Sequence, residues 1–259
     1  PALCSFVKRL LTSLGKGGDA VEVRTLDSFA LRNLSLLKID VEGFEQQVLK
    51  GAAATIARER PAIAVEIEGG LDLDTAPRQR QRRGWATLAM LDALGYVVRR
   101  VGVHDYLALP RRGGLALAYR RVLPARAKPF LSEAGRWRAN GVETTGRPGA
   151  LLFGPYSYLP PGSYLVHWRG RVDKAGALTF DVVSHKGKRS YAKRLLRAKP
   201  GEEGRLFTLA FTLEQEVADV ELRVVVSSEV RLRIQSAELC KLSEARLVAG
   251  KPRGGPGGA

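Results

Sequence analysis

Two short apolar runs separated by a helical stripe are the feature that most restricts the fold of this chain. Residues 34–40 (LSLLKID) and 62–68 (AIAVEIE) are predicted to be buried strands, because short continuous apolar runs are typical of strands covered on both faces. Between them, residues 44–58 carry apolar side chains four positions apart, and Pro61 ends the predicted helix. A strand, a helix and a second strand in this order indicate a parallel α/β unit.

The same alternation of strand and helix patterns continues to about residue 120. We expect an amphipathic helix over 1–14, a strand over 21–29, a polar loop over 69–83, a helix over 84–96, and strands over 96–103 and 115–122. This order predicts an α/β domain over residues 1–122 with a largely parallel sheet.

The second half of the chain has a different pattern. Residues 123–131 contain two prolines and two basic residues and are predicted to be a linker. Strand patterns separated by turn residues follow, at 150–172, 176–184, 205–213, 217–228 and 229–242. They predict an all-β domain over residues 132–243, an antiparallel β-sandwich or jelly roll, ahead of a flexible Gly- and Pro-rich tail over 244–259.

The charge and the cysteines limit the partners and the compartment. The net charge of +16 favours anionic partners, but the arginines are scattered and no zinc-finger spacing or aromatic RNA motif accompanies them, so we expect no specific nucleic-acid partner. No apolar run is long enough to predict a membrane span. Cys4 and Cys240 lie at opposite ends, which predicts free thiols and a reducing cytoplasm. Because position 1 is not Met, we expect the later part of a longer protein.

Carboxylates gather where the predicted strands end. Asp40 ends one strand, Glu42 and Gly43 follow in the loop, Glu45 falls in the first helical turn, and Glu66 ends the next strand. Ligands of open α/β sheets bind beyond the carboxyl ends of the strands, so these side chains suit orienting a hydroxyl or accepting its proton. A structural role is equally compatible with the spacing: Asp40 or Glu42 as a helix cap, and Glu45 as a complement to the helix dipole.

The first part of the chain closely resembles the second half of the methyltransferase domain of the FkbM family. The matching segments are Thr25-Leu26-Asp27, Lys38 to Gly43 (KIDVEG), Glu45, Val48 to Ala52 (VLKGA), and Pro61 followed by Glu66. The resemblance covers residues 21–68 well and 84–120 loosely.

The resemblance implies a partial Rossmann-like methyltransferase sheet and an O-methyltransferase that uses S-adenosylmethionine and acts on hydroxyls of glycans or related metabolites. By this reading Asp40, Glu42 and Glu66 are the catalytic carboxylates, and Lys38 points away from them. Residues 14–19 (LGKGGD) follow a helix-like segment and are predicted to be a loop, so no cofactor-binding residue is assigned and half of the cofactor site is missing. A carboxylate pair without a third fixed ligand predicts no metal site.

The start of the second part also resembles a known type of module. The segments FGPY (153–156) and LPPGSY (159–164), followed by an alternating strand, resemble carbohydrate-binding β-sandwiches. Tyr156, Tyr158 and Trp137 are candidate sugar-binding residues together with Glu45, although Tyr156 and Tyr158 equally suit packing at a strand edge. Tyr164 and Trp168 are expected in the core.

Two main functions therefore remain open, and a third is weaker. The first is part of a methyltransferase whose sandwich holds a glycan acceptor. The second is a non-catalytic glycan-binding module that retains a methyltransferase remnant. The third is an anionic-surface binder that relies on charge alone. The sequence does not define the acceptor or the oligomeric state.

Overall fold

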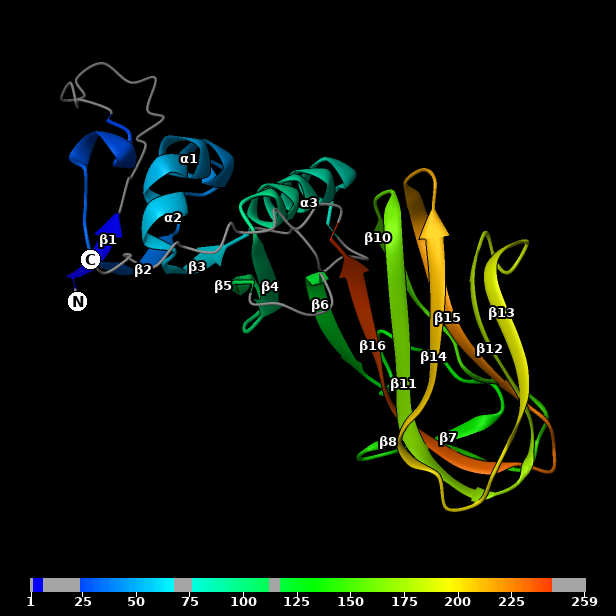
Figure 1. Cartoon of the computed structure of the whole chain (residues 1–259). Helices are drawn as coiled ribbons and strands as arrows, with labels where there is room; N and C mark the ends of the chain where they lie inside the picture. The colour runs from blue at the N-terminus through cyan, green and yellow to red at the C-terminus, as the bar shows by residue number, and fades with distance from the viewer. Residues whose placement is uncertain (1, 7–23, 68–75, 112–116, 244–259) are drawn as a thin grey trace, which may run out of the picture.

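The computed structural model of the chain describes residues 2–6, 24–67, 76–111 and 117–243 (Figure 1). Its first part alternates strands and helices. The elements are β1 (Ala2–Phe6), the 3-10 helix η1 (Leu26–Phe29), β2 (Leu34–Ile39), α1 (Glu45–Gly51), α2 (Ala53–Glu59), β3 (Ala62–Glu66), α3 (Arg78–Ala93), β4 (Tyr96–Arg100), β5 (Asp105–Pro110) and β6 (Leu117–Pro124).

The strands of this part form a mixed sheet in the order β1-β2-β3-β5-β4-β6. Neighbours β1 and β2, β2 and β3, and β4 and β6 are parallel, whereas β5 lies antiparallel between β3 and β4. Strands β2, β3, β4 and β6 therefore all point the same way, and their carboxyl ends share one edge of the sheet. Helices α1, α2 and α3 lie on one face of the sheet (Figure 1). The strand residues Leu37, Ile63 and Val98 are fully buried.

Several local predictions are confirmed and several are wrong. Strands β2, β3, β4 and β6 and the helices α1, α2 and α3 appear where they were expected, although α3 begins at Arg78, inside the predicted loop. The strand predicted over 21–29 is wrong for residues 26–29, which form a 3-10 helix, and residues 21–23 lie outside the described residues. The helix predicted over 1–14 is wrong for residues 2–6, which form the strand β1; residues 7–14 lie outside the described residues, as do 14–19 and 244–259.

Asp27 explains why a Thr-Leu-Asp segment stands before the first buried strand. Its carboxylate accepts hydrogen bonds from the backbone N–H groups of Thr55 (2.7 Å) and Ala54 (3.1 Å) in the first turn of α2. Burial alone would raise the pKa of Asp27, but the hydrogen bonds from Thr55 and Ala54 and the charge of Arg58 outweigh it and lower the pKa. The segment thus caps a helix that lies far along the chain.

Replacing this cap is expected to destabilise the fold. Asp27→Ala should lower the free energy of unfolding by about 1–2 kcal/mol, since two amide donors at a helix start lose their acceptor. Because the folded-state pKa is depressed, the contribution of Asp27 is present above its unfolded pKa and is lost as the pH falls through the folded pKa. Denaturant unfolding at neutral and acidic pH measures both effects. Asp173→Ala, which removes a half-exposed carboxylate, is the control and should change stability by less than about 0.5 kcal/mol.

The second part is all-β, as predicted. Its strands are β7 (Gly135–Arg138), β8 (Gly141–Thr144), β9 (Gly149–Leu152), β10 (Pro155–Leu159), β11 (Gly162–Lys174), β12 (Gly176–Ser184), β13 (Arg189–Ala198), β14 (Glu203–Leu213), β15 (Val217–Val226) and β16 (Arg231–Leu242). Among the described residues, β10, β15, β12 and β13 form one antiparallel sheet, with β9 also paired to β15. Strands β16, β11 and β14 form the facing layer (Figure 1).

The long sheet runs without interruption from the first part into the second. Strand β6 pairs antiparallel with β16, and β16 pairs antiparallel with β11. The predicted linker, 123–131, is packed: Leu123 belongs to β6, and Ala125 and Phe130 are buried. The division of the chain into domains remains a prediction, but the backbone hydrogen bonds across β6 and β16 join its two parts.

Candidate functional site

The predicted carboxylates lie together at the carboxyl edge of the sheet. Asp40 directly follows β2, Glu66 is the last residue of its parallel neighbour β3, and the loop between β2 and α1 supplies Glu42. The side chains of Asp40, Glu42, Glu45 and Glu66 line one concavity of about 290 Å³. Because parallel strands end at the same edge, residues that are 26 positions apart in sequence, Asp40 and Glu66, are brought side by side.

A tight left-handed turn carries the chain from β2 into α1. Glu42 and Gly43 have φ angles of 45° and 96°, and the first of these is uncommon for a residue with a side chain. The buried carboxylate of Glu45 accepts a hydrogen bond of 2.7 Å from the backbone N–H of Gly43. The φ angle of Gly43 favours glycine, whereas space does not: a Cβ atom there would meet only the movable end of the Arg83 side chain, at 2.9 Å. Glu45 therefore fixes the turn that presents Glu42.

Burial and the neighbouring carboxylates raise the pKa of Glu66. Burial raises the pKa of the Glu66 carboxyl above its ordinary value, and the charge of Asp40 and a hydrogen bond with it raise the pKa further. Asp105, the register partner of Glu66 on β5, adds to the same effect, and His104 opposes it. A carboxyl whose pKa is raised beside a second carboxylate is suited to accepting a proton or holding a hydroxyl.

Two of the structural alternatives are resolved by these contacts. The N-cap of α1 is Phe44, which makes no side-chain hydrogen bond, and no described bond joins Asp40 or Glu42 to the first turn of the helix. The capping alternative for Asp40 and Glu42 is therefore not supported.

The expectation for Lys38 is wrong. Its Nζ donates to Oδ2 of Asp40 at 3.1 Å, because residues two apart on a strand share a face. This alternation was the signal that could have placed Lys38 at the site.

The aromatic candidates lie in the sandwich and do not join the carboxylates (Figure 1). Trp137 lies on β7 and packs partly against the core, and Tyr156 lies on β10 with a φ angle of 62°. Burial raises the pKa of the Tyr156 phenol, and the charges of Glu221 and Glu133 add to this. Tyr164 and Trp168 are core residues, as expected.

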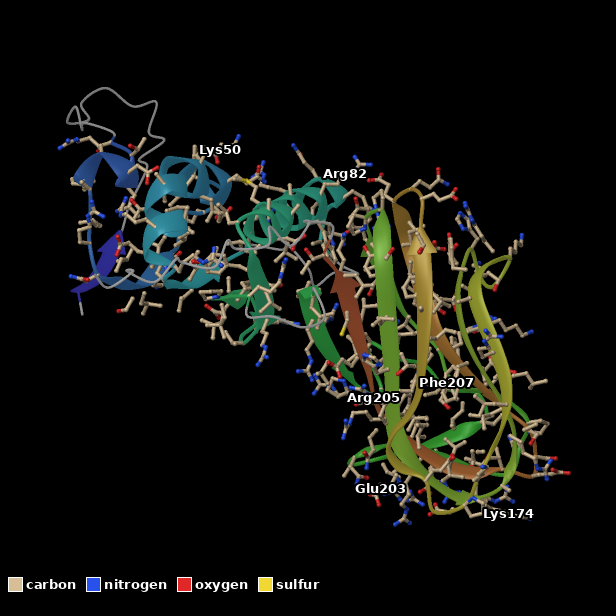
Figure 2. All side chains as sticks on the ribbon, viewed as in Figure 1. Lys50, Arg82, Lys174, Glu203, Arg205 and Phe207 are labelled. Carbon is tan, nitrogen blue, oxygen red and sulfur yellow. The ribbon has the colours of Figure 1, made fainter. Side chains whose placement is uncertain are left out.

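Tyr158 lies where the two parts of the chain meet. Its hydroxyl donates to Glu216 (2.7 Å), and Arg82 of α3 also donates to that carboxylate. Hydrogen bonds from Arg82 and then Tyr158 lower the pKa of Glu216 to about 2. Figure 2 shows Arg82 on α3 where the helix meets the sandwich. A mainly apolar cavity of about 450 Å³ lies at this junction, with Trp85, Tyr119 and Tyr158 in its wall.

The described thiol, Cys240, does not extend the site. Cys240 is a free, buried thiol, and burial, followed by the charge of Glu238, raises its pKa to about 11. Within the described ranges, no group of three or more His, Cys, Asp or Glu side chains is placed to hold a metal ion. None of the described helices has the length and apolar character needed to cross a bilayer.

This geometry defines a class of protein in which an α/β sheet carries a carboxylate-lined concavity at its carboxyl edge and continues into a β-sandwich. In sequence, residues 6–97 match the family model of the Methyltransferase FkbM domain. The match includes Asp27, Asp40, Glu42, Glu45 and Glu66, and it ends within β4. No curated protein sequence matches the chain.

The solved structures that are similar to this chain include carbohydrate-binding modules. A module of Cellvibrio mixtus lichenase 5A, in complex with cellotriose, is 12% identical, covers 47% of this chain and 96% of its own length, and has a TM-score of 0.33. A module from Cellvibrio japonicus Abf62 is 12% identical, with coverages of 49% and 99% and a TM-score of 0.36. The C-terminal module of the laminarinase LamC from Zobellia galactanivorans is 12% identical, with coverages of 47% and 99% and a TM-score of 0.32.

Proposed function

We propose that the carboxylate cluster is the acceptor side of an O-methyltransferase site, in which Asp40 and Glu66 receive the proton of an acceptor hydroxyl. The observation that carries the proposal is the concavity lined by Asp40, Glu42, Glu45 and Glu66 inside the matched methyltransferase region. Carboxylates accept hydrogen bonds from hydroxyls, so this lining favours a polyhydroxyl acceptor such as a glycan over an apolar one.

The roles of the residues follow from their contacts. Asp40 is held on one side by Lys38 and on the other by Glu66, which fixes the direction of its remaining oxygen lone pairs. The raised pKa of Glu66 makes this pair a better proton acceptor than an ordinary carboxylate when it is ionised. Glu42 stands at the open end of the concavity, on a turn held by Glu45, where it is placed to orient a second hydroxyl.

The methyl donor implied by the family match is S-adenosylmethionine, which would supply an electrophilic methyl group. The described residues do not by themselves fit this group: the turns they form at the carboxyl edge present carboxylates, and no glycine-rich turn between a strand and a helix occurs among them. In the described sheet, β2, β3 and β4 point one way and the helices lie on one face. We therefore propose that this sheet is the acceptor-binding half of a Rossmann-like methyltransferase domain, and we assign it no part of the donor site.

The test is methyl transfer from methyl-labelled S-adenosylmethionine to a panel of neutral and acidic oligosaccharides, with this chain and with the product of its whole reading frame. We expect label on an acceptor hydroxyl, with a rate that rises with pH as the Glu66 pair loses its proton. Absence of both transfer and saturable donor binding in both proteins would overturn the proposal. Oligosaccharide binding alone would instead favour a non-catalytic glycan-binding module.

A further inference from the structure

A second concavity at the carboxyl edge of the sheet is lined by arginines. Arg99 and Arg100 end β4, Arg120 and Arg121 lie on the parallel neighbour β6, and Val122 completes the lining of a space of about 320 Å³. Arg99 and Arg120 are register partners, so their side chains leave the sheet next to each other. Neither the family match nor the carboxylate cluster assigns a role to this group of arginines, which we call the arginine concavity.

The register places the arginine concavity close to the carboxylates. Ala64 of β3 pairs with Leu107 of β5, and Leu107 pairs with Arg99 of β4, so Arg99 leaves the sheet on the same face as Glu66, which lies two residues further along β3. Adjacent strands are about 4.8 Å apart, which separates Glu66 from the arginines of β4 and β6 by about 10–15 Å. A short oligosaccharide is long enough to reach from one concavity to the other.

The arginines of the concavity differ in their contacts with carboxylates. Arg120 forms an ion pair with Glu238, which is buried. No described side chain forms an ion pair with Arg99. Arg205 on β14 of the same long sheet (Figure 2) adds further positive charge, because it and Arg120 both act on His167. Burial lowers the pKa of His167, the charges of Arg205 and Arg120 lower it further, and Glu238 opposes them.

We propose that the arginine concavity binds an anionic group, a phosphate, sulfate or carboxylate, carried by the acceptor whose hydroxyl lies at Asp40 and Glu66. Guanidinium groups donate paired hydrogen bonds that fit such oxyanions and remain charged at every physiological pH. The carboxylate cluster repels the anionic group while the arginines attract it, so the acceptor is oriented along the edge of the sheet. The link to the acceptor rests on the proposed function, but binding of the anion does not.

The side chains that line the concavity favour binding of a single anionic group over binding of a nucleic acid. Its lining residues, Arg99, Arg100, Arg120, Arg121 and Val122, include no aromatic side chain on which a base could stack. Tighter binding of a single-stranded oligonucleotide than of an acidic oligosaccharide is therefore one of the outcomes that would contradict this proposal.

The experiment measures binding of inorganic pyrophosphate, a sulfated oligosaccharide and a uronate oligosaccharide by calorimetry at physiological ionic strength. Arg99→Gln is the test variant, since it removes no described ion pair. Arg194→Gln is the control: it removes the same charge from an exposed position on β13, in the other sheet. We expect Arg99→Gln to weaken binding about tenfold or more, as for loss of a charge-assisted hydrogen bond, and Arg194→Gln to leave it unchanged.

Each outcome of this test is decisive. If pyrophosphate binds as tightly as the best oligosaccharide, the anion comes from a free phosphate compound. If an oligosaccharide binds more tightly than pyrophosphate, the anion is carried by a glycan. Equal losses in both variants would show general charge attraction and overturn the proposal. Since no methyl donor is present, these measurements stand even if methyl transfer fails. Unchanged thermal unfolding of Arg99→Gln confirms that its effect is on binding.

Discussion

Replacing Asp40 with Asn is expected to slow methyl transfer by about 10²–10⁴-fold, the usual contribution of a positioned proton acceptor. The amide keeps the shape of the side chain but loses the negative charge that raises the pKa of Glu66. The same variant should therefore move the pKa of the Glu66 carboxyl down toward its ordinary value, which NMR titration of that carboxyl detects without any assay of activity. Asp173→Asn, the same change at a half-exposed position in the sandwich, should alter neither quantity.

Substitution of Glu66 is expected to change stability and methyl transfer in opposite directions. Because the folded-state pKa of Glu66 is raised, the folded protein holds its proton more firmly than the unfolded chain, and stability falls as the pH rises through that pKa. Glu66→Gln should then make the protein more stable than the wild type at neutral pH while lowering methyl transfer. A Glu66→Gln variant that is less stable at neutral pH, or fully active, would show that the carboxyl serves the fold and does not serve the site.

The carboxylate cluster was predictable because it depends on one general rule of parallel sheets. Two apolar runs with a helix between them imply parallel strands, and side chains after the ends of such strands meet at one edge. Asp40, Glu42 and Glu66 follow from that rule. The role of Asp27 did not, because its partners in α2 lie almost thirty residues away and nothing local in the sequence marks the contact.

The elements that were missed are those whose pairing partners are distant. Strand β5 is short, ends at Pro110 and enters the sheet antiparallel between β3 and β4, so only its neighbours define it. Without β5, the row of paired residues that joins Ala64 of β3 to Arg99 of β4 could not be drawn. Strand β13 carries many exposed basic side chains and no strand was predicted there. As an edge strand it covers little of the core, and its charges discourage pairing with another chain.

The start of α3 was missed for a related reason. Residues 78–83 are almost entirely polar and show no apolar stripe, so they were predicted as loop. They are nevertheless good helix formers that follow Pro77, and Arg82 finds its partner, Glu216, only once the sandwich has folded beside it. The sequence signal for a helix at 78–83 was therefore the helix propensity of its residues, without the apolar periodicity that usually marks a helix.

The core of the sandwich depends on an aromatic group that bridges its two sheets. Trp168 on β11 and Phe207 on β14 are register partners in the long sheet, and Phe180 on β12 reaches both from the facing sheet. The ring centroids are 4.8 Å apart for Trp168 and Phe180 and 5.1 Å apart for Phe180 and Phe207, and Trp168 and Phe180 are fully buried. Such pairs stabilise a core beyond the area that they bury.

Trp168→Ala is therefore expected to lower the free energy of unfolding by about 3–5 kcal/mol, since the cavity lies where the two sheets meet and neither can close over it. Trp168→Phe should cost less, because it keeps an aromatic ring and removes an indole N–H that is buried without a hydrogen-bond partner in the structure. Leu195→Ala, at a side chain that is 72% exposed on β13, is the control and should change stability by less than about 0.5 kcal/mol. Denaturant unfolding measures all three, and a loss for Trp168→Ala no larger than that control would mean that the sheets are not held together at this point. Because β11 is joined through β16 to β6, loosening of the sandwich should also reach the sheet that carries Arg120, which hydrogen exchange along β6 would detect.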